Sequence, residues 1–112
     1  MISKNYKTEP LKENPHKVEV KQMYNDASAQ IMHITLNPGE SLKPHKTPVD
    51  VVFYVLEVTP TVLVGNESQA FDKDTLIESP ANIVHCLSNE TSAQARILVI
   101  KAPRPLSKAR LL

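Results

Sequence analysis

Short runs of β-forming residues recur about every ten residues along most of this chain, with turn signals between them. The clearest run is Val49–Val58, which is dense in β-branched and aromatic residues. No ten-residue stretch before residue 103 shows helical periodicity. This pattern predicts an all-β sandwich or barrel. The expected strands are Ala29–Leu36, Val49–Val58, Thr61–Val64, Gln69–Phe71, Thr75–Glu78, Val84–Ser88 and Arg96–Lys101, with a hairpin turn at Gly65-Asn66.

The chain has 112 residues, which is enough for one domain with a core of ordinary size. Residues 1–20 lack a clear period and are expected to form an N-terminal arm, with Val18–Val20 as a short strand. Residues 21–101 are predicted to form the barrel. Residues 102–112 are a tail, in which Leu106–Leu112 either forms one or two helical turns or packs irregularly.

Composition narrows the class of protein. Hydrophobic residues make up 41% and charged residues 22%, as in globular domains. No apolar run is long enough to cross a bilayer, no signal peptide is recognisable, and a single cysteine suits a reducing compartment. We therefore expect a cytoplasmic protein without a membrane partner. Residues 91–112 hold five basic side chains and no acid, but no aromatic residues alternate with them, so no nucleic-acid partner is expected.

The apolar character of Val49–Val58 is almost continuous, which indicates a strand that is covered on both faces. One face can line the interior of a barrel. The other face also needs a cover in so small a chain. Sheet-to-sheet pairing of two copies would provide it, so the sequence predicts a homodimer.

Two segments each lead from a turn into a β-rich run and deliver one histidine: Pro38–His45 and Ser79–Asn89. In order and separation they resemble the paired motifs of the cupin superfamily, small β-barrels that often hold a metal. The resemblance covers about residues 29–101. It implies a single-domain cupin-type double-stranded β-helix, or jelly-roll, barrel.

The first motif is degenerate. Gly39 and His45 are in register with the family pattern, but Thr47 takes the place of the second histidine. Val51 or Val52 takes the place of the glutamate, and Val58 that of the closing glycine.

The second motif is better preserved. Pro80, His85 and Asn89 fall at the expected positions. Asp74 and Asn82 replace two glycines, and both residue types tolerate a positive φ.

The resemblance makes His45 and His85 candidate ligands of a divalent metal such as zinc, nickel, iron or manganese. A mononuclear site usually takes three or four protein ligands. Thr47, Asp50 and His33 are further candidate pocket residues. Thr47 can hold a water or orient a substrate. Asp50 should point outward by strand alternation unless a bulge rotates it inward. His33 either faces the interior as a third ligand or lies on the other face. The alternative for His45 and His85 is a hydrogen-bonded pair without metal.

The remaining histidine, His16, lies next to Pro15 and is expected to be a solvated loop residue.

Three functions follow from these residues. The first is binding of a small molecule in the barrel interior, with or without a divalent metal. The second is a metal-dependent dioxygenase or isomerase, with Asp50 or His33 completing the ligand set. The third is a non-catalytic structural or partner-binding module with Lys101–Arg110 as the docking element. Catalytic residues are not identified, and the sequence leaves open whether the protein is an enzyme. An interior filled by Val51, Phe53, Leu87 and Ile97 would favour the third function.

Overall fold

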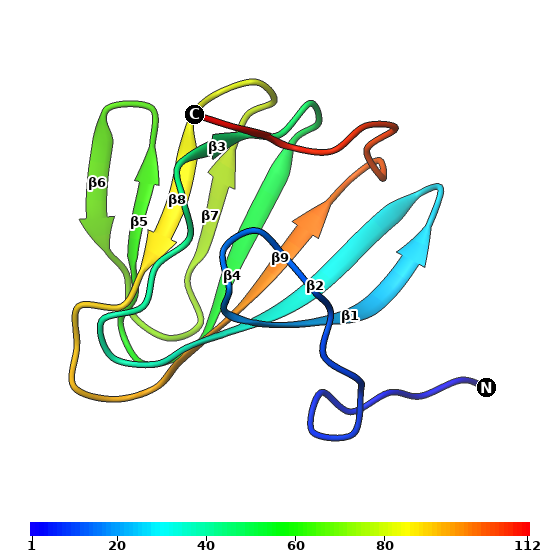
Figure 1. The fold of residues 1–112 in the computed structure, drawn as a ribbon, viewed down its shortest axis with the longest axis horizontal. Coiled ribbons are helices and arrows are strands. Elements are labelled where there is room, and N and C mark those ends of the chain that lie inside the picture. The colour runs from blue at the N-terminus through cyan, green and yellow to red at the C-terminus, as the bar shows by residue number, and fades with distance from the viewer.

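A computed structural model describes residues 1–112 of the chain (Figure 1). It contains ten strands and no helix. This confirms the all-β prediction, and no helix is present that could span a membrane. The strands are β1 Glu19–Asp26, β2 Ala29–Leu36, β3 His45–Lys46, β4 Val51–Glu57, β5 Thr61–Val64, β6 Glu67–Ala70, β7 Leu76–Ser79, β8 His85–Ser88, β9 Ala95–Lys101 and β10 Arg110–Leu111.

The strands form two five-stranded antiparallel sheets. The first has the order β1-β2-β9-β4-β7 and the second the order β10-β3-β8-β5-β6. In Figure 1 the sheet of β5, β6 and β8 lies to the left, and β9, β2 and β1 lie to the right. Consecutive strands cross repeatedly between the two sheets, as in a jelly roll. The predicted double-stranded β-helix barrel is therefore confirmed.

The core lies between the sheets because side chains alternate along each strand. In β4, Val51, Phe53 and Val55 are buried, whereas Val52, Tyr54 and Leu56 are only half-buried. Val51 and Phe53 belong to a cluster of eleven buried apolar residues that fills the interior. Burial of apolar surface on this scale is the main force that holds the sheets together.

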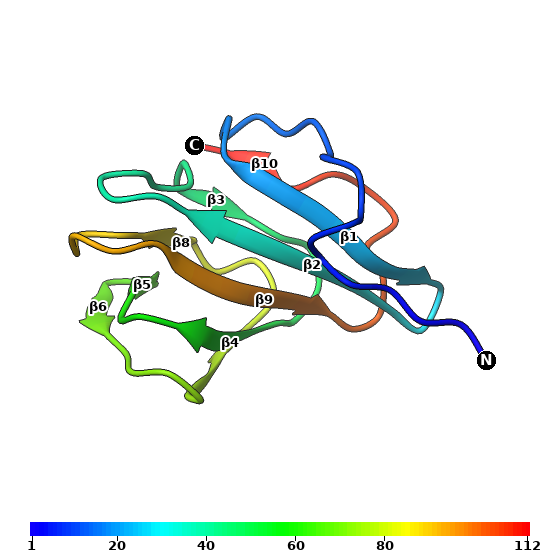
Figure 2. The ribbon, with the colours of Figure 1, turned by 90° about the horizontal axis from the view of Figure 1, so that it is seen from below.

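Most predicted strands lie within a few residues of the observed ones, but both ends of the chain differ. β1 runs to Asp26, well beyond the short strand expected at Val18–Val20. The tail residues Arg110 and Leu111 pair with Lys46 and His45 of β3 and so form a short strand instead of a helical turn. Figure 2 shows β10 close to β3.

Three residues that replace motif glycines have positive φ angles. Asp74 has φ 67° and Asn82 has φ 63°, a conformation that both residue types tolerate. Val58 also has a positive φ, 68°, although it is β-branched. A β-branched residue in this left-handed region is strained, because its Cβ crowds the following carbonyl.

Candidate functional site

The two motif histidines meet inside one end of the barrel. β3 and β8 pair at His45 and His85, and the ring centroids lie 4.6 Å apart at an interplanar angle of 73°. Phe53 lies under His85, with its ring centroid 5.3 Å away. His45 and His85 are 8% and 2% exposed. The structure thus brings together the two residues that the resemblance singled out.

Both ring nitrogens of His85 are hydrogen-bonded to hydroxyl groups. Ser79 Oγ lies 2.7 Å from Nδ1, and Thr47 Oγ1 lies 3.0 Å from Nε2. A neutral imidazole has one donor and one acceptor nitrogen, and a hydroxyl can play either role. Burial lowers the pKa of His85 to about 4, with smaller contributions from His45 and Lys101. His85 is therefore a neutral, fully satisfied side chain at pH 7.

One ring nitrogen of His45 has no hydrogen-bond partner in the chain. Its Nδ1 lies 2.7 Å from the carbonyl oxygen of Lys43. A carbonyl only accepts, so Nδ1 carries the proton and Nε2 presents a lone pair. Burial lowers the pKa of His45, against the raising effect of the Lys43 hydrogen bond.

A third histidine joins this pair from the N-terminal arm. The backbone N–H of Lys43 donates to Nδ1 of His16 at 2.8 Å, and the His16 ring centroid lies 4.9 Å from that of His45. Burial lowers the pKa of His16 to about 4, with smaller effects of the charges of His45, Lys43 and Lys101. The expectation of a solvated His16 is wrong, because the arm folds back over the end of the barrel.

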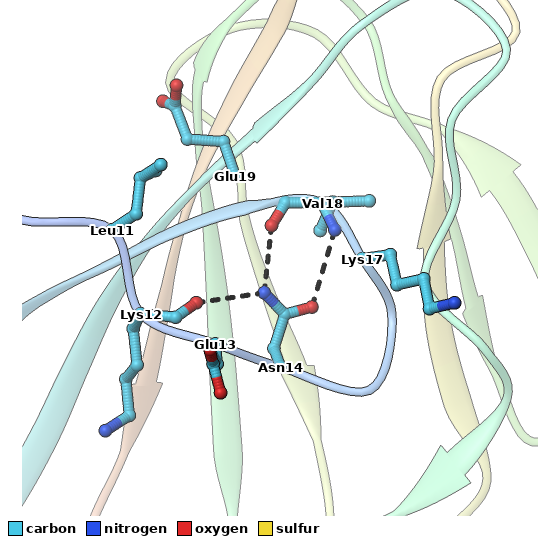
Figure 3. Close-up of a pocket in the computed structure, with 7 residues that line it drawn as sticks. All are labelled: Leu11, Lys12, Glu13, Asn14, Lys17, Val18 and Glu19. Carbon is cyan, nitrogen blue, oxygen red and sulfur yellow. Dashed lines mark hydrogen bonds between the residues drawn. The ribbon is translucent and has the colours of Figure 1, made fainter.

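Asn14 holds the loop that carries His16. Its Nδ2 donates to the carbonyls of Lys12 and Val18 at 3.1 and 2.8 Å (Figure 3). Its Oδ1 accepts from the backbone N–H groups of His16 and Val18 at 3.1 and 3.4 Å. The Asn14-Pro15 pair is a turn signal in the sequence, and it was the one available hint that residue 16 has a fixed place. A surface hollow of about 540 Å³ beside this loop contains none of the histidines, since its lining is Leu11, Lys12, Glu13, Asn14, Lys17, Val18 and Glu19.

Lys101 is the other site residue that sequence reasoning missed. Its neighbours at alternate positions of β9, Ile97 and Val99, are buried, so its side chain starts on the inner face. Lys101 pairs with Val51, and Val51 pairs with Ser79, the residue that binds His85. Lys101 therefore lies at the level of the histidines and not in an exposed docking tail.

The charge of Lys101 acts on all three histidines. It lowers the pKa values of His16, His45 and His85, although burial is the larger cause for each ring. Burial in turn lowers the pKa of Lys101 itself.

Asp50 and His33 do not share this site. Asp50 is exposed, and its Oδ1 accepts from the backbone N–H of Ala81 at 2.9 Å, which fixes the loop before β8. No bulge rotates it inward. His33 is buried on the outer face of β2, where Tyr6 of the arm stacks on its ring at 4.2 Å. Arg96 Nε donates to His33 Nε2 at 3.1 Å.

The donor set does not fit a resident metal ion. His45 Nε2 offers one lone pair, but the Thr47 hydroxyl occupies Nε2 of His85. Val51 provides no ligand where the family has a carboxylate, and no group of three or more His, Cys, Asp or Glu side chains gathers to hold a metal. The charge of Lys101, which lowers the pKa values of His45 and His85, also repels a cation. These residues lack the third and fourth ligands that a mononuclear site needs.

Comparisons with known proteins agree with this architecture. The family model of the cupin domain matches residues 32–101. A crystal structure from Thermus thermophilus is 30% identical, with a TM-score of 0.80 over 94% of this chain and 100% of that chain. An RmlC-like cupin family protein with a double-stranded β-helix fold from Methanocaldococcus jannaschii is 24% identical, with a TM-score of 0.75 over 94% of each chain.

The polyketide cyclase RemF from Streptomyces resistomycificus is similar in fold alone. It is 13% identical, and its TM-score is 0.85 over 100% of this chain and 85% of that chain. No curated protein matches the chain. The family model covers well over half of the residues and spans both histidine motifs. The chain therefore belongs to the cupin family.

Proposed function

We propose that the protein binds a small molecule at the end of the barrel where His16, His45, His85 and Lys101 gather. The observation that carries the proposal is this convergence of polar side chains from β3, β8, β9 and the N-terminal arm. Ligand sites typically combine apolar walls with a few such convergent polar groups. The single cysteine supports a cytoplasmic setting for this role.

The filled interior limits where the ligand can lie. Val51, Phe53, Leu87 and Ile97 are 1%, 2%, 0% and 0% exposed and occupy the space beneath the histidines. The ligand therefore binds at the rim, against His45, and not deep in the barrel. His45 Nε2 is available there as a hydrogen-bond acceptor because Nδ1 carries the proton.

A thermal-shift screen of neutral and charged small metabolites tests the proposal. We compare the wild type with His45→Phe, which keeps a ring but removes the acceptor. The matched control is His33→Phe, which replaces a histidine that is also buried but lies on the outer face. At least one compound should stabilise the wild type and the control but not His45→Phe. A screen without any such compound would end the proposal.

A second role, assembly into a homodimer through the outer face of the first sheet, is supported by a separate observation. Val52, Tyr54, Leu98 and Ile100 lie side by side on β4 and β9 and are only half-buried. Leu76 of the neighbouring β7 is 55% exposed. A contiguous apolar sheet face of this kind is typical of an interface, and a second copy would cover it. The filled interior also favours an interaction role.

Sedimentation equilibrium at micromolar concentration tests the dimer. Leu98→Glu should convert a dimer into a monomer, because a charge in the middle of the face would be buried without a partner. Leu63→Glu is the control, since Leu63 is equally half-buried but lies on β5 of the other sheet. A monomeric wild type, or a Leu98→Glu variant that stays dimeric, contradicts the interface.

A further inference from the structure

Lys101 is a half-buried cation without a counter-charge. No hydrogen bond joins its Nζ to any acceptor in the chain, and the one ion pair of the structure, 3.9 Å long, joins Arg96 and Glu57. Charged groups that lose their water are normally paired, because an unpaired buried charge is costly. Lys101 therefore has no charged partner within the chain.

The groups that face Lys101 do not provide this partner. Its inner-face neighbour in register is the apolar Val51. The three side chains on which its charge acts are His16, His45 and His85, and all three are neutral at pH 7 because burial lowers their pKa values. Asp50, which directly precedes β4, is exposed, and its carboxylate accepts a hydrogen bond from the backbone N–H of Ala81. None of these neighbours therefore pairs a negative charge with Lys101.

His16, whose ring centroid lies 4.9 Å from that of His45, offers a second donor. Nδ1 of His16 accepts the backbone N–H of Lys43, so the proton of the neutral ring is on Nε2. The His16 ring makes one hydrogen bond, to the backbone N–H of Lys43. Its Nε2–H therefore has no partner in the chain. An ammonium and an imidazole N–H are both hydrogen-bond donors, and together they can bind an oxyanion.

We infer that the small molecule bound at the His45 end of the barrel carries an oxyanion group, a carboxylate or a phosphate, which the Lys101 ammonium anchors. The inference rests on the proposed function and specifies the class of its ligand. It also accounts for the poor fit of a metal ion, because the charge that attracts an anion repels a cation. Charge-assisted hydrogen bonds of this type are shorter and stronger than neutral ones.

Titrations of the ¹⁵N-labelled protein with sodium acetate and with sodium phosphate, at constant ionic strength, test the inference. The histidine ring signals report binding. Lys101→Met keeps the apolar stem and removes the charge, and Lys101→Arg keeps the charge. The control is Lys46→Met, since Lys46 follows the inward-facing His45 on β3 and points to the opposite side.

At least one anion should shift the ring signals saturably in the wild type, in Lys46→Met and in Lys101→Arg. Its dissociation constant should rise at least tenfold in Lys101→Met. Preference for acetate identifies a carboxylate and preference for phosphate a phosphate group. Without anion, Lys101→Met should unfold at the same temperature as the wild type or higher, which shows that the variant folds.

Equal anion affinity in Lys101→Met, or no anion binding at all, overturns the inference. If neutral compounds still bind in the thermal-shift screen and this binding depends on His45, the proposed function stands and only the anionic class is wrong. If neither anions nor neutral compounds bind, both fall.

Discussion

The hydroxyl of Thr47 lies 3.0 Å from Nε2 of His85, at the nitrogen that a metal ion would need. Ser79 holds the other ring nitrogen at 2.7 Å, in the way that outer-shell partners orient metal-bound histidines. His85 thus keeps the orientation of a metal-binding histidine. The neutral hydroxyl of Thr47, however, occupies the position at Nε2 that a metal ion would take. Thr47 and Ser79 are each 1% exposed, so these hydrogen bonds are shielded from water.

Thr47→Val should destabilise the fold by about 1–3 kcal/mol, because it leaves a buried ring nitrogen of His85 without a partner. Thr47→Ser keeps the hydroxyl and serves as the control, with a smaller loss that reflects one methyl group. Urea unfolding at pH 7 measures both. Equal stability of Thr47→Val and the wild type would show that the hydrogen bond contributes nothing.

Thr47→His should create zinc binding, because it restores an imidazole where the family pattern has one, beside His45 and His85. After dialysis against zinc and then buffer, the untagged wild type should retain well below one equivalent, and Thr47→His more. Elemental analysis measures the metal content. The Thr47→His, His45→Ala double variant is the control and should lose the gain. Stoichiometric zinc in the wild type would contradict our interpretation of the donor set.

Asn14→Ala should release His16 from the end of the barrel, because four hydrogen bonds of the Asn14 side chain hold its loop. The pKa of His16 should then rise from about 4 toward its ordinary value of 6.5, since burial and nearby charges no longer oppose protonation. An NMR pH titration of the ring measures this.

Asn5→Ala is the matched control, because Asn5 makes a similar turn in the exposed part of the arm, through the Lys7 N–H. It should leave the His16 titration unchanged. An unaltered pKa in Asn14→Ala would mean that the His45 contact, and not Asn14, fixes the loop.

The sequence is sufficient for the fold and for the two motif histidines, because both depend on local patterns. Turn residues mark the ends of Ala29–Leu36, and alternation assigns Phe53 to the core. The positive φ of Asp74 and Asn82 is also readable, since these residue types tolerate it.

The rest of the site depends on how distant segments meet, which no local pattern encodes. His16 reaches His45 only because the N-terminal arm folds back, and its neighbours in sequence are those of any surface loop. Lys101 sits at the end of β9, where the strand can be read as the start of a basic tail. Its inward direction follows only from the register with Val51. His33 could not be assigned to a face until the arm's Tyr6 was seen to cover it.

Acidification should destabilise the protein between pH 6.5 and 4. His33 and His85 have pKa values lowered to about 4, chiefly by burial, whereas an unfolded histidine titrates near 6.5. In this window the unfolded state binds more protons, so the free energy of unfolding falls as pH falls, and the loss levels off once the folded rings are protonated near pH 4. Each ring contributes at most about 1.4 kcal/mol per pH unit.

Urea unfolding at pH 7.0 and 5.5 measures this dependence. His33→Phe should lose less stability over that interval than the wild type, because one of the titrating rings is gone. His16→Phe should reduce the dependence by a similar amount, since the pKa of His16 is also lowered to about 4. A pH dependence that is identical in the wild type and His33→Phe would show that His33 does not stay neutral in the folded state.

The Val58→Gly variant should be more stable than the Val58→Ala variant, which is the reverse of the usual order for these two residue types. Its φ of 68° lies in the left-handed region, which costs about 1–2 kcal/mol for a residue with a Cβ but little for glycine. Val58→Gly and Val58→Ala both lose the contacts that Val58 makes with the core, so their difference isolates the backbone. Urea unfolding should give Val58→Gly the advantage by about 1 kcal/mol. As a control, the same pair of substitutions at Val64, a half-buried strand residue, should favour alanine. If alanine is favoured at both positions, Val58 carries no backbone strain, and the missing glycine of the first motif has no energetic consequence.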